Sequence, residues 1–323
     1  MPLRNWRRKE VRDNNNISTW DAFSDYIIEH ASKCDDFFLL SSTDIVAPRL
    51  FDSIPSDKMI FRSVSASNLV LNAAGLAIEG KRPIVLSSSP SIVIDGYRKI
   101  RDGLAIPSMP VSIAVADSGL SRGSDGTSCN VLEDIALMRS LPNMNIFVPS
   151  GKASVVLSAE NARQLNAPSY FRLSNTKVLR VDDVMSADSN GMDFLTSGTD
   201  VTICACGVMV DQALRAFDVL EQGGISAEIV DCCKIKPFPE QILLSSVRKT
   251  GCCVVAEEHS SIGGLSSAVS DCLSKTYPVA TRFVAVENQF VNSGTPDELR
   301  EYYGLTWKEI VNAAAEVWAL RRR

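Results

Sequence analysis

The stretch that decides the fold class begins with Val201-Thr-Ile-Cys-Ala-Cys206, continues with Val210-Asp-Gln-Ala-Leu-Arg-Ala-Phe-Asp-Val-Leu220 and ends with Ala227-Glu-Ile-Val230. The first and last parts are short apolar runs that favour buried strands, and the middle part is long enough for a helix of about three turns. A strand, a helix and a strand in this order predict a βαβ unit with parallel strands.

The same alternation of short apolar runs and longer helical patterns extends from this unit in both directions. On the C-terminal side, Val254–Ala256 and Val279–Val286 are further strand candidates. On the N-terminal side, a separate series begins with a strand candidate at Phe37–Leu40 and a long helical pattern at Ala66–Glu79. We therefore expect an α/β protein with two tandem parallel-sheet α/β domains.

A charged and polar stretch separates the two series and is typical of a linker between domains. It contains Arg180, Asp182, Asp183 and Asp188. The expected organisation is an N-terminal arm at residues 1–17, a first domain at 18–178, a linker at 179–198 and a second domain at 199–323.

Composition and charge exclude several classes of protein. Of the 323 residues, 45% are hydrophobic and 22% are charged, which is typical of globular proteins and not of disordered or coiled-coil chains. The longest apolar runs, such as Val111–Ala116, are far shorter than the roughly 20 residues of a membrane span. The net charge of −5 creates no field that attracts nucleic acid. The N-terminal arginines are followed by Asn14, Asn15 and Asn16 and not by the apolar core of a secretory signal, so we expect a cytoplasmic protein that binds neither nucleic acid nor membranes.

The cysteines give no sign of a disulfide framework or of a metal site. Nine occur in the chain, an odd number, and no two have the Cys-x-x-Cys spacing of zinc ligands. Most lie in apolar runs and are expected to be buried as small hydrophobic side chains. We therefore expect no metal on this chain.

Several strings in the sequence resemble transketolases. Those similar to the transketolase C-terminal domain are Val201–Gly207, Lys234-Ile-Lys-Pro-Phe238, Val254-Val-Ala-Glu-Glu-His-Ser-Ser-Ile-Gly-Gly-Leu265, Gly294-Thr-Pro-Asp-Glu-Leu299 and Tyr303-Gly-Leu-Thr306. Those similar to the transketolase pyrimidine-binding domain are Asn68–Ala77, Glu79–Pro83, Asp125-Gly126, Glu133–Arg139 and Leu141–Met144. Because the strings follow the family's order over nearly the whole chain, the resemblance implies both domains.

The resemblance also implies a cofactor and a partner. In transketolases, thiamine diphosphate lies between the pyrimidine-binding domain and a diphosphate-binding domain whose Gly-Asp-Gly motif binds the metal. This sequence has neither that motif nor a matching domain. We therefore expect the C-terminal section of a split transketolase, sharing thiamine diphosphate with a separate N-terminal section that carries the diphosphate and Mg²⁺ or Ca²⁺. Half-sites on each protomer imply a hetero-oligomer that self-associates through a two-fold interface.

The residues expected to face the cofactor depart from the family pattern. Transketolases carry a Gly-Ile-Ala-Glu-Gln-Asn string, whose glutamate hydrogen-bonds the pyrimidine ring. Here the string is Ser63-Val-Ser-Ala-Ser-Asn68, and Ala66 occupies the glutamate's place. A methyl group can neither donate nor accept a hydrogen bond. Two further serines replace aromatic residues that flank the pyrimidine in the family. The cofactor-binding candidates are Ser65, Ala66, Ser67, Ser88 and Ser91.

The residues expected on the substrate side change as well. The family's His-x-Gly-Ile-x-Val-Gly-x-Asp-Gly-x-Ser-His-Gln region corresponds to Asp117–Asn130, where Asp117 and Cys129 replace the two histidines. Asn175 replaces a phosphate-binding arginine, although Arg172 stands nearby. These changes suggest a small sugar substrate other than the usual pentose phosphates. The substrate candidates are Asp44, Asp117, Ser128, Arg172 and Asn175.

His259, Asp125 and Cys129 are the candidates for catalytic residues, and each has a structural alternative. Asp125 could contact a substrate hydroxyl or form only a turn. His259 follows Glu257 and Glu258, whose carboxylates could hold the ring charged at the edge of the site or in the interior. Cys129 has no histidine close to it in sequence, so a nucleophilic role stays open.

Three functions remain compatible with the sequence. The first is a catalytic subunit of a transketolase-like transferase that moves a two-carbon ketol unit from a sugar donor to a specialised acceptor. The second is a scaffold or regulatory subunit that keeps the fold but has lost cofactor activation. The third is a β-type subunit of a pyruvate dehydrogenase, which the transketolase-like Glu-Glu-His and Gly-Thr-Pro strings disfavour.

Overall fold

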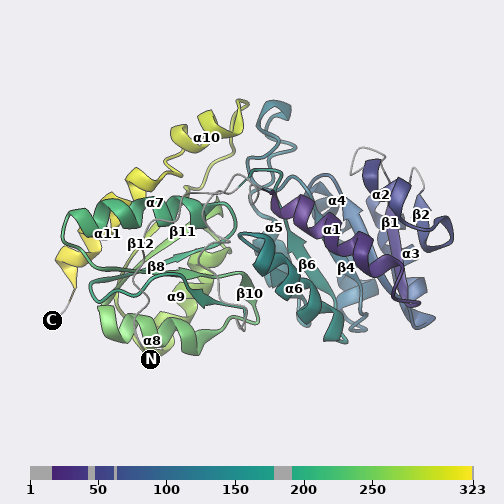
Figure 1. The fold of residues 1–323 in the computed structure, drawn as a ribbon, viewed down its shortest axis with the longest axis horizontal. Coiled ribbons are helices and arrows are strands. Elements are labelled where there is room, and N and C mark those ends of the chain that lie inside the picture. The colour runs from purple at the N-terminus through teal and green to yellow at the C-terminus, as the bar shows by residue number, and fades with distance from the viewer. Residues whose placement is uncertain (1–16, 43–47, 62–63, 178–190, 322–323) are drawn as a thin grey trace.

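The computed structural model describes residues 17–42, 48–61, 64–177 and 191–321. Two sheets lie side by side, and each is covered by helices on both faces (Figure 1). The first sheet has the strand order β10-β5-β6-β4-β3-β1-β2 and the second the order β12-β11-β8-β9-β7. All pairs are parallel except two that involve the edge strands β10 and β7. The expected α/β fold with two parallel-sheet domains is thus confirmed.

The first sheet is built mainly from the N-terminal half of the chain. Its strands are β1 (Phe37–Ser41), β2 (Met59–Phe61), β3 (Arg82–Ser87), β4 (Ser112–Val115), β5 (Asn145–Phe147), β6 (Ser169–Arg172) and β10 (Lys234–Lys236). Its helices are α1 (Thr19–Ala31), α2 (Pro48–Ser53), α3 (Ala66–Ile78), α4 (Ser91–Ile100), α5 (Asp134–Arg139) and α6 (Lys152–Gln164). Helices α1 and α6 bury their apolar residues with one face of the sheet, and α3 and α4 with the other.

The second sheet belongs to the C-terminal half. Its strands are β7 (Asp193–Phe194), β8 (Val201–Ala205), β9 (Ala227–Asp231), β11 (Cys252–Ser260) and β12 (Ala280–Val286). Its helices are α7 (Met209–Gln222), α8 (Glu240–Thr250), α9 (Leu265–Thr276), α10 (Pro296–Tyr302) and α11 (Trp307–Leu320). Helices α7 and α11 share a core with one face of the sheet, while α8 and α9 pack on the other.

The two domains are connected more closely than a tandem arrangement requires. Strand β10, from the C-terminal half of the chain, pairs antiparallel with β5 and so completes the edge of the first sheet. One continuous apolar core contains residues of α3 and α4 together with residues of α8 and α9. Residues 193 and 194, within the segment expected to be a linker, form β7 on the second sheet. A strand from the C-terminal half therefore belongs to the first sheet, and helices of both domains pack in one apolar core.

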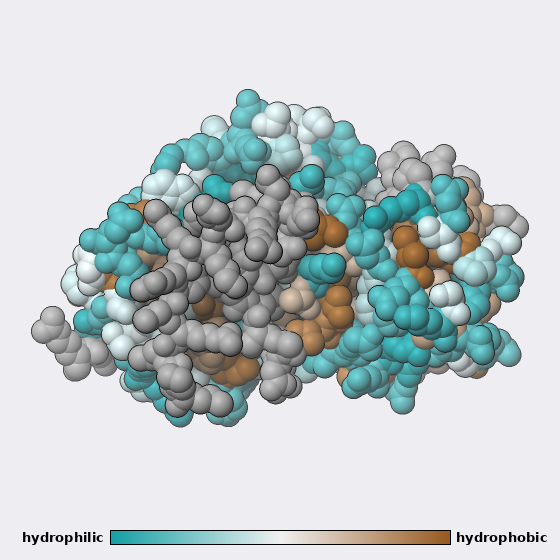
Figure 2. Space-filling model, viewed as in Figure 1, coloured by the Kyte–Doolittle hydropathy of each residue, from teal (hydrophilic) through white to brown (hydrophobic). Residues whose placement is uncertain are grey.

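Among the described residues, no helix combines the length and the apolar character that crossing a membrane requires. On the face shown in Figure 2, the coloured residues are mostly hydrophilic, and hydrophobic ones form small groups.

Candidate active site

The carboxyl ends of three neighbouring parallel strands bring predicted site residues together. Ser88 follows β3, Asp117 follows β4 and Asn175 follows β6, and these strands are adjacent in the order β6-β4-β3. In open α/β sheets, ligands bind at this end of the strands. Residues almost 90 positions apart in the chain therefore lie at the same end of neighbouring strands, and we call this group of residues the strand-end cluster.

Asp117 and Asn175 form a direct pair within this cluster. The side-chain amide of Asn175 donates a hydrogen bond to the carboxylate of Asp117. Burial raises the pKa of the Asp117 carboxyl above its ordinary value, and the charge of Asp125 adds to this effect. The hydrogen bond from Asn175 and the charge of Arg122 act in the opposite direction. The asparagine thus stabilises the ionised form of a carboxyl group that burial disfavours.

Arg122 contacts the strand-end cluster, and the sequence motifs did not predict it. Its Nε donates to Asp125 Oδ2 at 2.7 Å, and its Nη1 donates to Ser88 Oγ at 3.3 Å. It therefore connects a residue expected on the substrate side with one expected on the cofactor side. A signal was present in the sequence, since Arg122 is the single cation between Asp117 and Asn130.

The first turn of α3 holds the predicted cofactor-binding residues. Ser65 is the N-cap, and its hydroxyl accepts a hydrogen bond from the Asn68 backbone N–H. Ala66 is the first residue of the helix, and the Ser67 hydroxyl donates to the backbone oxygen of Asp95. No acidic residue occurs in this first turn. Both hydroxyls next to Ala66 are therefore engaged in structural hydrogen bonds.

Ser91, the last of the predicted cofactor-binding residues, begins α4. Its backbone N–H donates to Ser89 Oγ at 3.2 Å. This contact belongs to the turn between β3 and α4, in which the Ser87 hydroxyl also donates to the Ser89 backbone oxygen at 2.9 Å. The serines that replace the family's aromatic residues therefore lie in a hydrogen-bonded turn at the carboxyl end of β3.

The remaining predicted residues of the Asp117–Asn130 loop are partly open to solvent. Ser128 is exposed, and Cys129 is half-buried, with its backbone N–H donating to Gly126. Thr127 ties the loop to the C-terminal domain by donating from its hydroxyl to the Val291 backbone oxygen at 2.6 Å. Asp44 lies outside the described residues.

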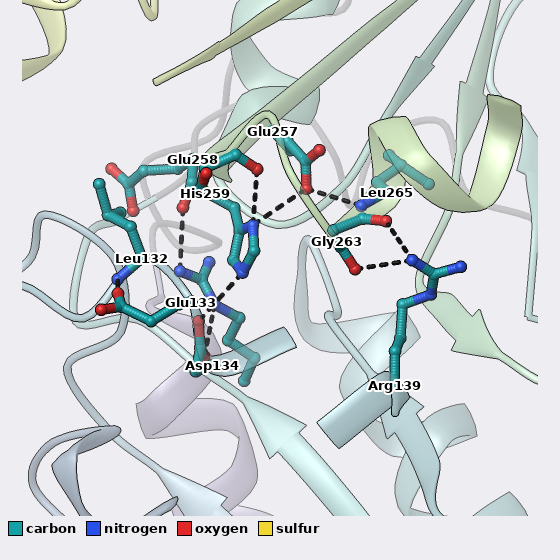
Figure 3. Close-up of polar contacts among 12 residues, drawn as sticks. Leu132, Glu133, Asp134, Arg139, Glu257, Glu258, His259, Gly263 and Leu265 are labelled. Atoms are coloured by element: carbon teal, nitrogen blue, oxygen red, sulfur yellow. Dashed lines mark hydrogen bonds and ion pairs between the residues drawn. The ribbon is translucent and has the colours of Figure 1, made fainter. Parts of the chain in front are cut away.

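A second polar cluster lies in the interior between the domains (Figure 3). Asp134, at the start of α5, accepts hydrogen bonds from Tyr170 Oη at 2.6 Å and from Arg172 Nε at 2.8 Å. Arg172 also donates to the backbone oxygen of Glu258 at 2.9 Å. Burial by itself lowers the pKa of Arg172, but the charges of Asp134, Tyr170 and Glu258, together with the hydrogen bond to Asp134, outweigh it and hold the pKa above its ordinary value. Arg172, predicted to bind substrate, thus serves as a buried interdomain tie.

His259 belongs to this interior cluster and not to the strand-end cluster. The ring is completely buried, and Nδ1 lies 2.8 Å from the backbone oxygen of Ser260, so Nδ1 carries a proton. Its Nε2 lies 3.7 Å from Asp134 Oδ1, and neither atom has a hydrogen-bond partner among the described residues. A second proton on the ring would face Asp134 directly.

In the Glu-Glu-His-Ser-Ser-Ile-Gly-Gly-Leu string, Glu257 and the two glycines make structural contacts. The Glu257 carboxylate accepts from the backbone N–H groups of Leu265 and Ser266, both at 2.7 Å, and so caps α9. A Cβ at Gly264 would lie 2.1 Å from Glu257 Oε2, so only glycine allows this approach. From α5, Arg139 donates to the Gly263 backbone oxygen at 2.7 Å (Figure 3). The string therefore builds a helix cap and an interdomain contact.

The described residues contain no group of three or more histidine, cysteine, aspartate or glutamate side chains arranged to hold a metal ion.

Comparisons with known proteins place this architecture in one family. Two family models match, namely "Transketolase, pyrimidine binding domain" over residues 15–179 and "Transketolase, C-terminal domain" over residues 191–310. The chain is 34% identical over 301 residues to "6-deoxy-6-sulfo-D-fructose transketolase subunit SqwH" of Clostridium sp. (strain MSTE9), covering 92% of this chain and 93% of that protein. It is 28% identical to an apulose-4-phosphate transketolase subunit of Phocaeicola vulgatus, covering 94% of this chain and 98% of that protein.

A solved structure leads to the same family. It is described as "Split gene transketolase, inactive beta4 tetramer" and superposes with a TM-score of 0.83 at 32% identity, covering 95% of this chain and all of that one. Both relatives and this structure match the chain over nearly their whole length. The chain therefore belongs to the transketolase family, as a split-transketolase-like C-terminal section composed of the pyrimidine-binding and C-terminal domains.

Proposed function

We propose that this chain is one subunit of a split transketolase-like enzyme that transfers a two-carbon ketol unit from a sugar donor to a specialised acceptor. A separate N-terminal section would hold the diphosphate of thiamine diphosphate and its Mg²⁺ or Ca²⁺, and the two kinds of subunit would assemble around a two-fold axis. The observation that carries the proposal is the end-to-end match to proteins named as transketolase subunits, together with the hydrogen bonds that connect Ser88, Arg122 and Asp125 and pair Asp117 with Asn175 at the strand ends.

The residues present do not fit the usual activation of that cofactor. The first turn of α3 offers Ala66 where the family resemblance places a glutamate, and it contains no acidic residue. The neighbouring hydroxyls of Ser65 and Ser67 are already hydrogen-bonded to the backbone. We therefore derive no catalytic step through the cofactor from this chain's residues.

Co-expression tests the assembly. The chain is produced together with a transketolase-like N-terminal section from the same genome, and the complex is measured by native mass spectrometry. We expect a complex that contains both chains and transfers a ketol unit only when both are present. A chain that turns over substrate alone would contradict the proposal.

Ala66 favours a second candidate function, a non-catalytic scaffold or regulatory subunit. The two candidates differ in cofactor binding, which isothermal titration calorimetry measures directly. If the chain is an enzyme subunit, the complex should bind thiamine diphosphate more tightly than the N-terminal section alone does. If the chain is a scaffold, it should add nothing to the affinity of the N-terminal section for the cofactor.

The variant Ala66→Glu separates the two candidates further. In an enzyme complex, the added carboxyl group should accelerate deuterium exchange at C2 of the cofactor by up to roughly 10²–10⁴-fold, the usual contribution of general acid–base catalysis. Ala66→Gln is the matched control, since it has the same length without the acid. Equal C2 exchange rates in the wild type and both variants would contradict the hypothesis that the missing carboxyl group at position 66 limits activation of the cofactor.

The substrate side should discriminate against ordinary pentose phosphates. Asn175 lacks the charge of the arginine found in the family, and losing a hydrogen bond to a charged group costs about 1.5–3 kcal/mol, or roughly 10- to 150-fold in affinity. Arg122 is already paired with Asp125, so it does not restore a free cation. A donor screen should therefore rank xylulose 5-phosphate below other ketoses, and efficient turnover of that sugar with ribose 5-phosphate would contradict this expectation.

A further inference from the structure

The loop at residues 117–130, between β4 and α5, carries charged side chains at the strand ends of the first sheet. Asp117 lies at its start and belongs to the strand-end cluster. Arg122, in its middle, donates to Asp125 of the same loop at 2.7 Å and to Ser88 of the cluster at 3.3 Å. The contacts that hold this loop therefore also decide where its charges lie.

The C-terminal domain holds the middle of the loop. Helix α10 lies beside it (Figure 1). The Gly294 backbone N–H donates to the Gly123 backbone oxygen at 3.1 Å, and a Cβ at Gly123 would lie only 2.3 Å from the Gly294 oxygen. Leu120 is fully buried and shares the apolar core of the C-terminal domain with Leu299 of α10. The loop is therefore packed against the second domain as well as against its own sheet.

A buried ion pair of the C-terminal domain lies next to the start of the loop. Glu258 of β11 and Arg300 of α10 are only 3% and 9% exposed, and Arg300 Nη1 donates to Glu258 Oε1 at 3.1 Å. Arg300 Nη2 also donates to Asp297 at 2.7 Å. Burial by itself lowers the pKa of Arg300, but the charges of Glu258 and Asp297, and the hydrogen bonds to both, hold the pKa above its ordinary value. The guanidinium therefore stays charged in the interior.

The second carboxylate oxygen of Glu258 lies against Gly119 of the loop. Gly119 has a φ of +62°, in the left-handed region, and a Cβ there would lie 2.2 Å from Glu258 Oε2. Glycine is the residue that meets both conditions, because it has no Cβ. Since Arg300 binds the other oxygen of the same carboxylate, the position of the ion pair constrains the position of the loop.

We propose that Glu258 and Arg300 are positioning residues of the site: they fix the loop at Gly119 and so keep Arg122 in contact with Ser88. The C-terminal domain thereby places a charged group at the strand ends of the first domain. This inference rests on the proposed function in one respect, since the strand-end cluster is taken to face the sugar substrate. The tests below need no substrate, so their failure is distinct from a failure of the complex to transfer a ketol unit.

NMR of the Arg122 side chain tests the proposal in the full-length chain. Its Nε–H group is bonded to Asp125, so the rate at which this hydrogen exchanges with solvent measures how often the loop opens. In the variant Arg300→Met, Glu258 loses its charged partner. We expect the exchange to become about tenfold faster, the lower end of the effect of losing a hydrogen bond to a charged group.

Lys249→Met is the matched control. It removes the cation from Glu228, another buried glutamate of the same domain, by the same kind of substitution. We expect it to leave the exchange rate of the Arg122 Nε–H group unchanged, because this pair makes no recorded contact with the loop. Equal Arg122 exchange rates in Arg300→Met and Lys249→Met would overturn the proposal.

The thiol of Cys129 gives a second measurement on the same loop. Cys129 is half-buried, and so is Cys34, which follows α1 at a distance in the chain from the loop. After alkylation with iodoacetamide, mass spectrometry measures the reaction of each thiol separately. Arg300→Met should accelerate the reaction of Cys129 and not that of Cys34. Equal acceleration at both cysteines would also overturn the proposal, because it would show a general loosening of the fold.

Gly119→Ala is an independent variant that leaves every charge in place. Its Cβ would displace the loop from Glu258, so we expect it to reproduce the faster exchange of the Arg122 Nε–H group. This variant decides the question if Arg300→Met does not fold. Exchange as slow as in the wild type would contradict the role of the contact between Gly119 and Glu258.

Discussion

Two aspartate–arginine pairs in this molecule have nearly the same geometry and very different surroundings. Asp134 and Arg172 lie 2.8 Å apart at the domain junction, with exposed side-chain fractions of 0% and 5%. Asp125 and Arg122 are 2.7 Å apart in the loop after β4, with exposed fractions of 40% and 30%. The first pair is surrounded by further buried partners, and the second faces solvent. The first pair is therefore shielded from water, whereas water reaches the second.

The same contrast separates two strings that resemble transketolase from residues that depart from the family pattern. Glu133–Arg139 and Val254–Leu265 are among the strings that resemble the family, and the structure places both in the interior junction. The changed residues Ala66, Asp117 and Asn175 lie at the start of α3 and at the strand ends. For these two strings, family likeness thus coincides with contacts that pack the two domains together.

The largest expected effect is that of Asp134→Ala on stability. The variant leaves Arg172 buried without its carboxylate, and breaking one partner of a buried ion pair costs about 3–5 kcal/mol. We expect the free energy of unfolding, measured by urea denaturation, to fall by this amount. A loss below about 1 kcal/mol would show that the junction has another partner for Arg172.

Asp231 offers the next largest effect, as a dependence of stability on pH. It is fully buried at the end of β9, and this burial raises the pKa of its carboxyl to about 7. A hydrogen bond donated by Ser150 of the first domain acts in the opposite direction and lowers the pKa. Because the folded state holds this proton more tightly than the unfolded state does, the stabilisation is complete below about pH 4. It is lost at about 1.4 kcal/mol per pH unit as the pH rises to about 7.

Asp231→Asn removes this titration, since the amide cannot ionise. We expect the urea-unfolding free energy of the variant to decline less than that of the wild type between pH 5 and pH 7. Parallel pH profiles for the two proteins would contradict the raised pKa. Asp193→Asn is a useful companion, because the charge of Asp193 contributes to raising the pKa of Asp231.

The smallest expected effect is that of Asp125→Ala, the exposed counterpart of the first variant. Surface ion pairs typically contribute 0–1 kcal/mol, so the unfolding free energy should change by less than about 1 kcal/mol. A loss as large as that of Asp134→Ala would abolish the contrast between the buried and the exposed ion pair. The double variant Asp125→Ala/Arg122→Ala should be as stable as the single variant Asp125→Ala, because neither variant leaves a buried charge unpaired.

The family strings predicted Ser88, Asp117, Asp125 and Asn175, whose hydrogen bonds lie at the strand ends of the first sheet, but they did not define the roles of these residues. Arg172 and His259 were predicted at or near the site, and both lie in the buried junction. Arg122 was not predicted because the corresponding family position is apolar. Its contacts with Asp125 and Ser88 depend on a conformation of the loop that local sequence does not specify.

By itself, the sequence determined that this protein has two parallel-sheet domains and belongs with transketolases, because hydrophobic periodicity and short motifs are local properties of the chain. Only the tertiary structure decided that β10 crosses to the first sheet and that Arg139 meets Gly263, 124 residues away. It also decided which charged residues are buried and which are exposed. Those outcomes depend on how helices and strands pack in space, and residue spacing along the chain does not encode the distance between separate elements.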